Sequence, residues 1–492
     1  MPQDNTAKMG RNTLLYLLAM LVPKIIAIFT LPLYSHYIPP ADYAIFNYTT
    51  NFSTFLAVVS ALGLNTYYLL SYPKSEDKKL LNGTMFWFLT LWNAVMLVFM
   101  GFGLLLLWPY LHMSFSYFPY VPMALVTHFF FVVDVIPMRT YRLRGEVHFY
   151  MIRVILKSIM QAGFGILFVV VMKKGVMGKY WSEFIHNFVF AVVFLIYMIR
   201  NSYLKIDKAI LKDGLKFGLP LVPSGMLKHG HAAINSAITE KMVSLVQLGI
   251  YSMGSSIAQV IQMVTSSISL AVEPEYYIHA GTPTYNDFVR KMKSIQLVVV
   301  GWFCVGCALF VREAVVLFLS ASYGDSWQVV QVLAVSFMVS ILTGIYTTLS
   351  TIEKRTKFLL VLNIGIIGVM VGTEILFLHF VGIIGIGLAN ICINLFSFIV
   401  QYFYIGRKKL KKMNLSRDFI MISVAVAVIY FTNYFRSFNI WICIVLKLLI
   451  FAEYTAILLL VYNMSISDLI GFVFKKKKAG KKESVEVTDK NA

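Results

Sequence analysis

The sequence predicts an all-α polytopic membrane protein with about fourteen transmembrane helices. Of its 492 residues, 59% are hydrophobic and only 13% are charged, which is about half the charged share of a typical soluble domain. Apolar runs of about 18 residues or more, long enough to cross a bilayer as a helix, recur along the whole chain. No stretch between these runs is long enough to fold as a second, water-soluble domain.

The predicted spans and the positions of the basic residues agree with each other. The spans cover residues 12–36, 43–70, 84–108, 118–138, 150–172, 180–200, 214–238, 244–272, 294–319, 328–352, 357–378, 382–405, 416–434 and 439–462. With these spans, most of the 43 Lys and Arg residues fall in segments on one side of the membrane. Because cytoplasmic loops carry the excess of Lys and Arg, we expect an even number of spans and two cytoplasmic termini. The start of the chain has no small-residue cleavage site, so we expect no cleavable signal peptide.

The spans divide the chain into four parts. We expect a first six-helix lobe at residues 1–200, a second at 201–410, a helix pair at 411–474 and a tail at 475–492. The tail is rich in lysine and has no apolar face, so we expect it to be disordered. Its lysines would lie near anionic cytoplasmic lipids, or would simply stop translocation of the last helix.

A short repeat relates the two six-helix lobes. Leu221-Val222-Pro223 in the seventh span matches Leu21-Val22-Pro23 in the first, and Gly249-Ile250-Tyr251 in the eighth is similar to Ala44-Ile45-Phe46 in the second. Since both matches occur in the same order, we expect two parallel lobes related by pseudo-twofold symmetry. Transporters with parallel repeats place their substrate site at the interface of the two halves.

Polar side chains form stripes on several of these spans. At steps of three or four residues, the eighth span carries Ser252, Ser255, Gln259, Gln262, Ser266, Ser269 and Glu273. The seventh carries Ser224, Lys228, His231, Asn235 and Thr239, and the second carries Asn47, Asn51 and Thr54. Small polar residues can simply join neighbouring helices. A full-length stripe with large amides instead predicts a water-filled lumen, because polar groups at this depth need water or partners.

Lysines inside the spans are the strongest candidates for substrate binding. A lysine at the bilayer centre costs roughly 2.5–3.5 kcal/mol, so we expect Lys24 and Lys228 to face the lumen rather than lipid. The alternative is a structural pair with a buried acid. Lys157 lies nearer the cytoplasmic edge and could extend its amine to the interface. His231 shares the helix face of Lys228 and could titrate near neutral pH.

These observations define two predicted sets of residues. The expected substrate-binding set, in a central cationic cavity, is Lys24, Lys228, His231, Asn235, Asn47, Asn51, Gln259, Gln262 and Lys157. The candidate ion-coupling acids are Asp134, Glu273 and Glu374, for which the alternative is an interfacial or salt-bridged carboxylate.

The chain lacks the motifs of several other functions. Cys304 and Cys307 form a CxxC, but they lie in an apolar helix, so we expect them to pack rather than bind metal. No Walker A run, dinucleotide fingerprint or HExxH is present, so we expect no enzyme and no cofactor. Transport would then depend on an H⁺ or Na⁺ gradient, the membrane potential or the substrate's own gradient. The net charge of +20 lies mainly in alternate short loops, which argues against nucleic acid as the partner.

The sequence resembles one family over nearly its whole length. Lys212 to Ser224 (KDGLKFGLPLVPS), Gly249-Ile-Tyr-Ser252 and the opening Asn12 to Tyr43 are similar to the polysaccharide-transport (Wzx-type) flippases. These flippases belong to the multidrug/oligosaccharidyl-lipid/polysaccharide (MOP) exporter superfamily. The chain departs from the pattern at Asn235-Ser236, where relatives often carry Asp-Arg. Lys228, two turns earlier, could supply the missing positive charge.

The resemblance implies two six-helix lobes, two extra C-terminal helices, a central cationic cavity and alternating access. It also implies an undecaprenyl-diphosphate-linked oligosaccharide as substrate, flipped across the bacterial cytoplasmic membrane for surface polysaccharide biosynthesis. Membrane lipids and other polysaccharide-assembly membrane proteins would be the partners. A lipid II-type flippase, a MATE-like multidrug exporter and a polysaccharide polymerase or ligase stay open as alternatives. Short external loops disfavour the last of these.

Overall fold

The computed structural model describes residues 3–407, 410 and 413–465, without the side chains of most residues at the start of α1 and of some other helical residues that include Lys228 and His229. Every secondary-structure element in this part of the chain is helical, which confirms the predicted all-α fold.

The first half of the chain forms a group of helices that we call the N-lobe. Its members are α1 (Gln3–Tyr37), α2 (Pro40–Ser60), α3 (Leu64–Ser71), α4 (Lys78–Leu111), α5 (Tyr120–Val133), α6 (Val135–Leu143), α7 (Val147–Gly165), α8 (Gly175–Asn201) and α9 (Lys208–Gly218). Leu64, Tyr68 and Met85 lie in its largest buried apolar cluster.

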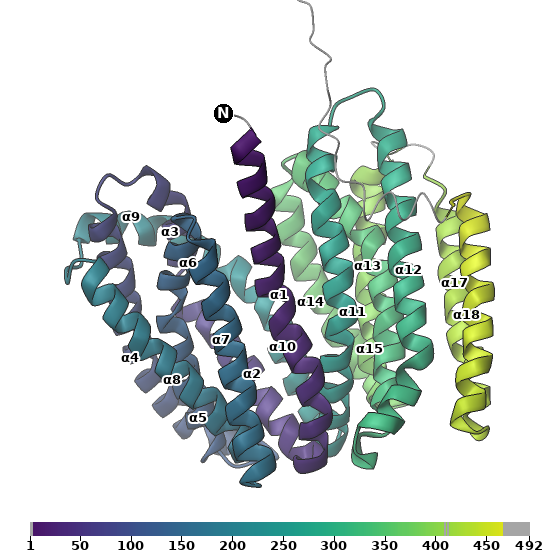
Figure 1. Ribbon diagram of the computed structural model, residues 1–492, viewed down its shortest axis with the longest axis horizontal. Helices are drawn as coiled ribbons and strands as arrows, with labels where there is room; N and C mark the ends of the chain where they lie inside the picture. The colour runs from purple at the N-terminus through teal and green to yellow at the C-terminus, as the bar shows by residue number, and fades with distance from the viewer. Residues whose placement is uncertain (1–2, 408–409, 411–412, 466–492) are drawn as a thin grey trace, which may run out of the picture.

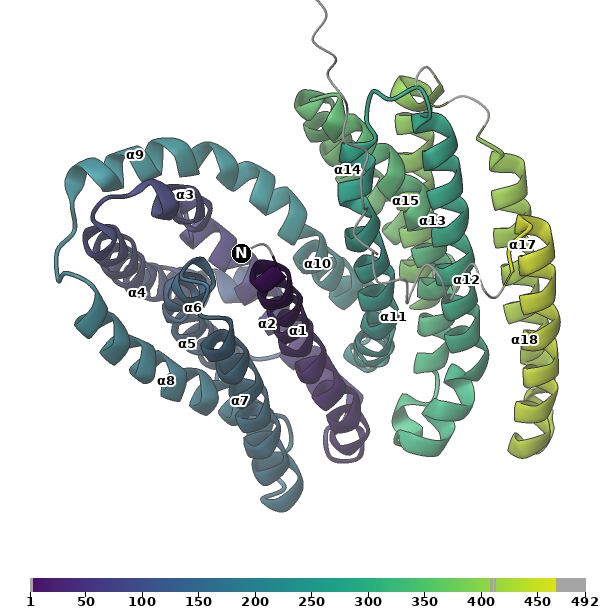
Figure 2. The same cartoon turned by 45° about the horizontal axis from the view of Figure 1, so that its top comes forward.

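The second group of helices, the C-lobe, follows α10 (Val222–Met242), which lies between the two lobes (Figures 1 and 2). The C-lobe contains α11 (Leu245–Ile278), α12 (Tyr285–Phe318), α13 (Ser326–Ile352), α14 (Thr356–Val381), α15 (Ile384–Gln401), α17 (Leu415–Thr432) and α18 (Ile440–Tyr462). The pair α17 and α18 lies at the edge of the molecule, far from the N-lobe.

Twelve segments in the described part of the chain are long and apolar enough to cross a membrane, and the bent pair α2–α3 would be a thirteenth. They match the predicted spans except for the seventh. Residues 214–238 cover the end of α9 and most of α10. With its many polar residues, α10 is not among the helices that are apolar enough to cross a membrane. The number fourteen and the pseudo-twofold symmetry therefore stay predictions, as do the domain boundaries.

The second predicted span is not straight. Leu62 and Gly63 adopt positive φ angles of 52° and 68°, and α3 leaves α2 at an angle of 57°. Gly63 packs directly on Gly218 at the end of α9, where a Cβ atom would lie 2.2 Å from the Gly218 carbonyl oxygen. Glycine is required here by both the backbone conformation and the close approach.

The lobes meet at the end of the molecule opposite the N-terminus. Tyr323, in the turn before α13, donates to the carbonyl of Ile38 at 2.8 Å, and the Ser320 N–H donates to Ser35 Oγ at 3.1 Å. Gly249 of α11 lies so close to Pro40 that a Cβ would approach its carbonyl oxygen to 1.8 Å. The glycine of the Gly249-Ile-Tyr motif therefore permits close packing of α2 on α11.

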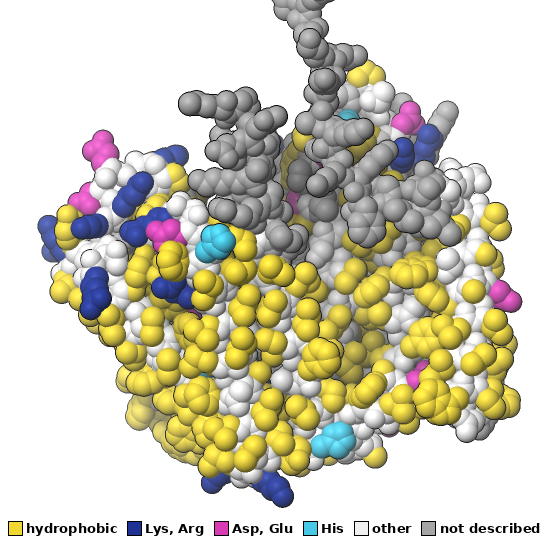
Figure 3. All heavy atoms as spheres, in the orientation of Figure 1, with side chains coloured by type: hydrophobic (Ala, Val, Ile, Leu, Met, Phe, Trp, Pro, Cys, Tyr) yellow, Lys and Arg dark blue, Asp and Glu magenta, His cyan; other side chains and the backbone are white. Residues whose placement is uncertain are grey.

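Apolar side chains cover most of the face of the bundle that Figure 3 shows, between its two ends. Most of the Lys and Arg side chains visible on this face lie at the end where the N-terminus is found, and a few lie at the opposite end. This is the pattern that a multi-pass membrane protein needs, because lipid contacts the apolar belt and water contacts the two ends.

Candidate functional site

A polar cavity of about 460 Å³, the interlobe cavity, lies between α2, α10 and α14. Its polar lining comes from Asn51 and Thr54 of α2, His231 of α10 and Asn363 of α14. Asn51 also donates to Ser236 Oγ at 3.1 Å, which links α2 directly to α10. Asn51 and His231 were predicted from two separate stripes, and the structure brings them to one cavity. Sequence reasoning missed Asn363.

A buried carboxyl group lies further along α14 than the residues that line this cavity, and its hydrogen-bond partner lies further along α10. Asn235 Nδ2 of α10 donates to Glu374 Oε1 of α14 at 2.8 Å. Glu374 is fully buried, and its Oε2 has no hydrogen-bond partner within the described residues. A buried carboxyl with a free oxygen can take up a proton or a cation. Asn235 and Glu374 were predicted for different roles, and the structure makes them partners.

Other predicted site residues lie elsewhere. Asn47 donates to the carbonyl of Tyr43 on its own helix at 2.9 Å. Gln259 and Gln262 are exposed on α11, and Glu273 is half-buried near the end of that helix. The polar stripe of α11 does not contribute to the lining of the interlobe cavity.

The structure describes the side chain of only one of the two central lysines, Lys24 and Lys228. Lys24 is exposed on α1, next to Pro23, which lines a cavity inside the N-lobe. The backbone of Lys228 belongs to α10, but its side chain lies outside the described residues. Its role in substrate binding therefore stays a prediction.

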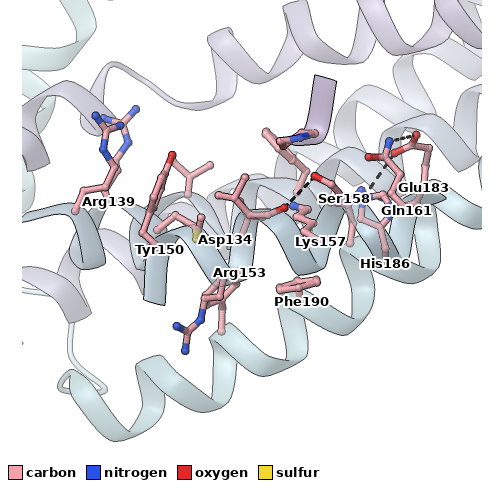
Figure 4. Close-up of a pocket in the computed structure, with 18 residues that line it drawn as sticks. Asp134, Arg139, Tyr150, Arg153, Lys157, Ser158, Gln161, Glu183, His186 and Phe190 are labelled. Carbon is pink, nitrogen blue, oxygen red and sulfur yellow. Dashed lines mark hydrogen bonds and ion pairs between the residues drawn. The ribbon is translucent and has the colours of Figure 1, made fainter. Parts of the chain in front are cut away.

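The third predicted lysine, Lys157, lines a cavity of about 440 Å³ inside the N-lobe, the N-lobe cavity (Figure 4). Lys157 Nζ donates to Asp134 Oδ2, and this ion pair lies near the middle of the cavity in Figure 4. Three further cations, Arg139, Arg142 and Arg153, line the cavity as well. Four described cations therefore line the N-lobe cavity, whereas the described lining of the interlobe cavity has neutral polar side chains and one histidine.

A second N-lobe cavity of about 350 Å³ adjoins the first, because both are lined by Phe131, Gln161, Glu183 and Asn187. Thr54 of α2 lines this second cavity and the interlobe cavity. The three cavities therefore form a series in which neighbours share lining residues, from the interior of the N-lobe to the interlobe cavity.

The shared wall of the N-lobe cavities contains a hydrogen-bonded acid that sequence reasoning missed. Glu183 accepts from Gln161 Nε2 at 2.6 Å and pairs with Lys179 at 3.4 Å and with His186 at 3.8 Å. Ser182, Glu183, His186 and Asn187 occupy one face of α8 at steps of three and four residues. The same stripe criterion applied to the sixth predicted span would have found them.

Two ion pairs in the C-lobe are formed by residues that line none of the three cavities described above. Lys293 of α12 pairs with Asp418 of α17, both side chains are fully buried, and Tyr462 of α18 donates to Asp418 at 2.9 Å. Lys447 of α18 donates to both oxygens of Glu313 of α12, at 2.8 and 2.9 Å. These pairs attach α17 and α18 to α12, and the sequence reasoning assigned them no role.

Comparisons with known proteins were consistent with this architecture. The polysaccharide biosynthesis protein family matches residues 9–274. No match was found among curated protein sequences.

Solved structures are similar in fold. The lipid II flippase MurJ, in an inward closed conformation, aligns with a TM-score of 0.71 at 13% identity, over 91% of this chain and 99% of MurJ. An inward-facing multidrug resistance MATE family transporter of the MOP superfamily gives 0.56 at 16% identity, over 80% of this chain and 99% of its own. A mutant of the Vibrio cholerae MATE transporter VcmN gives 0.55 at 12% identity, over 82% of this chain and 99% of its own. The chain therefore belongs to the polysaccharide biosynthesis protein family and has the fold of the MOP superfamily.

Proposed function

We propose that this protein is a flippase that moves an undecaprenyl-diphosphate-linked oligosaccharide from the cytoplasmic to the outer leaflet of the bacterial cytoplasmic membrane. The observation that carries the proposal is a polar interlobe cavity in a chain of the polysaccharide biosynthesis family. Sugar hydroxyls lose hydrogen bonds to water when they enter a membrane, which is costly unless partners replace that water. Asn51, His231 and Asn363 offer donors and acceptors for this purpose.

The polyprenyl chain has the opposite requirement. It is apolar and can stay in lipid beside the protein while the sugars cross, so its hydration cost is avoided. Lobes that meet at one end of the molecule, as these do through Tyr323 and Gly249, fit an alternating-access cycle in which the contact moves to the other end.

The diphosphate requires positive charge. Lys228 precedes His231 by three residues in the sequence, and we keep it as the proposed source of that charge. Lys24 is its proposed counterpart on α1.

We also propose Glu374 as the ion-coupling carboxylate. Its hydrogen bond to Asn235 joins α10 to α14, and its second oxygen is free to accept a proton or a Na⁺ ion. Asp134 is a weaker candidate because Lys157 already balances its charge, and Glu273 is only half-buried.

The test is flipping of a defined lipid-linked oligosaccharide in proteoliposomes, with and without an H⁺ or Na⁺ gradient. His231→Ala and Asn363→Ala should each slow flipping about ten-fold, the effect of one lost hydrogen bond worth about 1.4 kcal/mol. Asn390→Ala is the matched control, because Asn390 donates to the carbonyl of Ile386 on its own helix. Equal rates in all three variants would contradict a substrate role for the interlobe cavity.

The same vesicles separate the alternative functions. Lipid II and a cationic dye serve as competing substrates. Faster movement of lipid II than of the oligosaccharide would favour a peptidoglycan-precursor flippase, and dye export alone would favour a multidrug exporter. Extension of the oligosaccharide would indicate a polymerase or ligase instead.

A further inference from the structure

Three arginines line the N-lobe cavity without a carboxylate partner in the part of the chain that the structure describes. The ion pairs formed by the described residues include none to Arg139, Arg142 or Arg153. Arg139 donates one N–H to the carbonyl of Asn65 at 2.8 Å, and Arg153 stacks on the ring of Tyr141 at 4.1 Å. A guanidinium has five N–H donors, so most of their hydrogen-bonding capacity is still available.

The neighbouring arginine on the same hairpin shows that this is not a general property of the region. Arg144 donates to the hydroxyls of Tyr72 and Tyr197, each at 3.1 Å, and pairs with Glu146 at 3.9 Å. It does not line the N-lobe cavity. Of the cations that line the cavity, Lys157 is paired with Asp134, whereas the three arginines have no carboxylate partner among the described residues.

The acids of the cavity do not supply that anion. Asp134 is paired with Lys157, and Glu183 is occupied by Gln161, Lys179 and His186. Figure 4 shows Arg139 and Arg153 at the Tyr150 end of the cavity, with Lys157 and Asp134 in between and Glu183 and His186 at the other end. The cavity thus has an arginine end and a carboxylate end.

The arginine end lies where α6 turns into α7, at the end of the bundle that holds the N-terminus (Figure 1). The distribution of basic residues predicts that this end faces the cytoplasm. Arginines at the depth of lipid headgroups, in a pocket between membrane helices, bind phosphate groups through charge-assisted and often bidentate hydrogen bonds.

We propose that the arginine end of the N-lobe cavity binds the phosphate group of a lipid from the cytoplasmic leaflet. The phosphate could belong to an anionic phospholipid or to a polyprenyl diphosphate. The second source rests on the proposed flippase function, whereas the first does not. In either case the phosphate neutralises guanidinium groups that have no carboxylate partner among the described residues.

The test measures lipid binding by native mass spectrometry of the full chain in detergent. The probes are phosphatidylglycerol, phosphatidylcholine, undecaprenyl diphosphate and undecaprenol, so that charge and chain type vary separately. We expect the wild type to retain one or both anionic lipids in preference to phosphatidylcholine, whose phosphate is balanced by its own choline cation, and to undecaprenol, which has no phosphate. Arg139→Gln with Arg142→Gln should weaken that retention at least ten-fold, and Arg139→Lys with Arg142→Lys should weaken it less.

The matched control is Arg200→Gln with Lys205→Gln. It removes two exposed positive charges outside the cavity lining at the same end, Arg200 in the last turn of α8 and Lys205 just after that helix. Arg142→Gln alone changes an exposed side chain and supplies the test if the double variant fails to fold. Because no flipping step is measured, the result is independent of the flipping assay.

The outcomes separate the sources. Loss of phosphatidylglycerol alone identifies a phospholipid site, loss of undecaprenyl diphosphate alone identifies a subsite for the substrate, and loss of both supports a general lipid-phosphate site. Unchanged retention in the cavity variants overturns the proposal, as does an equal loss in the control. The arginines would then serve only to orient the chain in the membrane.

Discussion

In the C-lobe, Lys293 and Asp418 are both fully buried and Tyr462 completes their hydrogen bonding, whereas in the N-lobe Lys157 and Asp134 line a cavity and keep 18% and 9% of their side-chain surface exposed. The first pair joins α12 to α17, and the second joins α7 to the junction of α5 and α6. Only the first is enclosed by the large apolar cluster around α12, α13 and α18.

This difference shows how the same residue types serve two purposes. An enclosed ion pair depends on its partner for all its solvation, so it fixes α17 and α18 to α12. A pair beside a cavity has access to water or a ligand, so its geometry can change during a transport cycle. If enclosure rather than the presence of charge distinguishes the two pairs, breaking the C-lobe pair should cost more stability than breaking the N-lobe pair.

The largest expected effect is in the enclosed pair. Lys293→Met leaves a buried Asp418 with a single hydroxyl donor, Tyr462, and should lower the free energy of unfolding by about 3–5 kcal/mol. Lys293→Met with Asp418→Leu removes both charges and should recover most of that loss. Unfolding of the purified protein in detergent, followed by fluorescence, measures both variants. If Lys293→Met is as stable as the wild type, the enclosed pair does not hold the C-lobe together and the contrast between the two ion pairs fails.

A somewhat smaller effect is expected at the second C-lobe pair. Lys447→Met should cost about 3 kcal/mol, near the lower end of the range for a broken buried pair. Arg312 still lies 3.5 Å from Glu313 and can partly replace the lost cation. Glu453→Gln is the control on the same helix, because its side chain is exposed. It should change stability by less than about 0.5 kcal/mol, and a larger loss there than in Lys447→Met would contradict the assignment.

The N-lobe pair should be less costly to break. Lys157→Met should lower the free energy of unfolding by about 1–3 kcal/mol, less than for the enclosed pair, because the buried Asp134 left behind lines a cavity. Flipping should fall while the folded fraction, measured by size-exclusion chromatography, stays unchanged. If Lys157→Met destabilises the protein as much as Lys293→Met, the N-lobe pair is structural and the two lobes do not differ in this respect.

The smallest effect on stability is expected at Glu374. Glu374→Gln keeps an oxygen that can accept from Asn235, so the free energy of unfolding should change by less than about 1 kcal/mol. Flipping should lose its response to the ion gradient, because the amide cannot take up a proton. Flipping rates measured with and without the gradient test this, and a response equal to that of the wild type would exclude Glu374 as the coupling group.

The membrane architecture could be predicted from the sequence because it depends on local properties. The apolar runs and the stripes on spans two and seven are visible in consecutive residues. The all-α fold followed from them and is confirmed. The family followed instead from the resemblance of short motifs such as Lys212 to Ser224, and it is confirmed as well. The stripes also contained Asn51 and His231, which the structure places at one cavity.

Only the tertiary structure decided which charges meet. Lys293 and Asp418 are 125 residues apart, and Asn235 and Glu374 are 139 apart. Their pairing depends on which helices become neighbours, and no periodicity within a single helix contains that information. The bend at Gly63 has the same origin, because it depends on contact with Gly218. The sequence alone determined which segments are long and apolar enough to cross a membrane, since transfer free energy adds up along a segment. The structure decided which contacts each polar residue makes in these segments, because a polar group away from water needs a hydrogen-bonding partner within the protein.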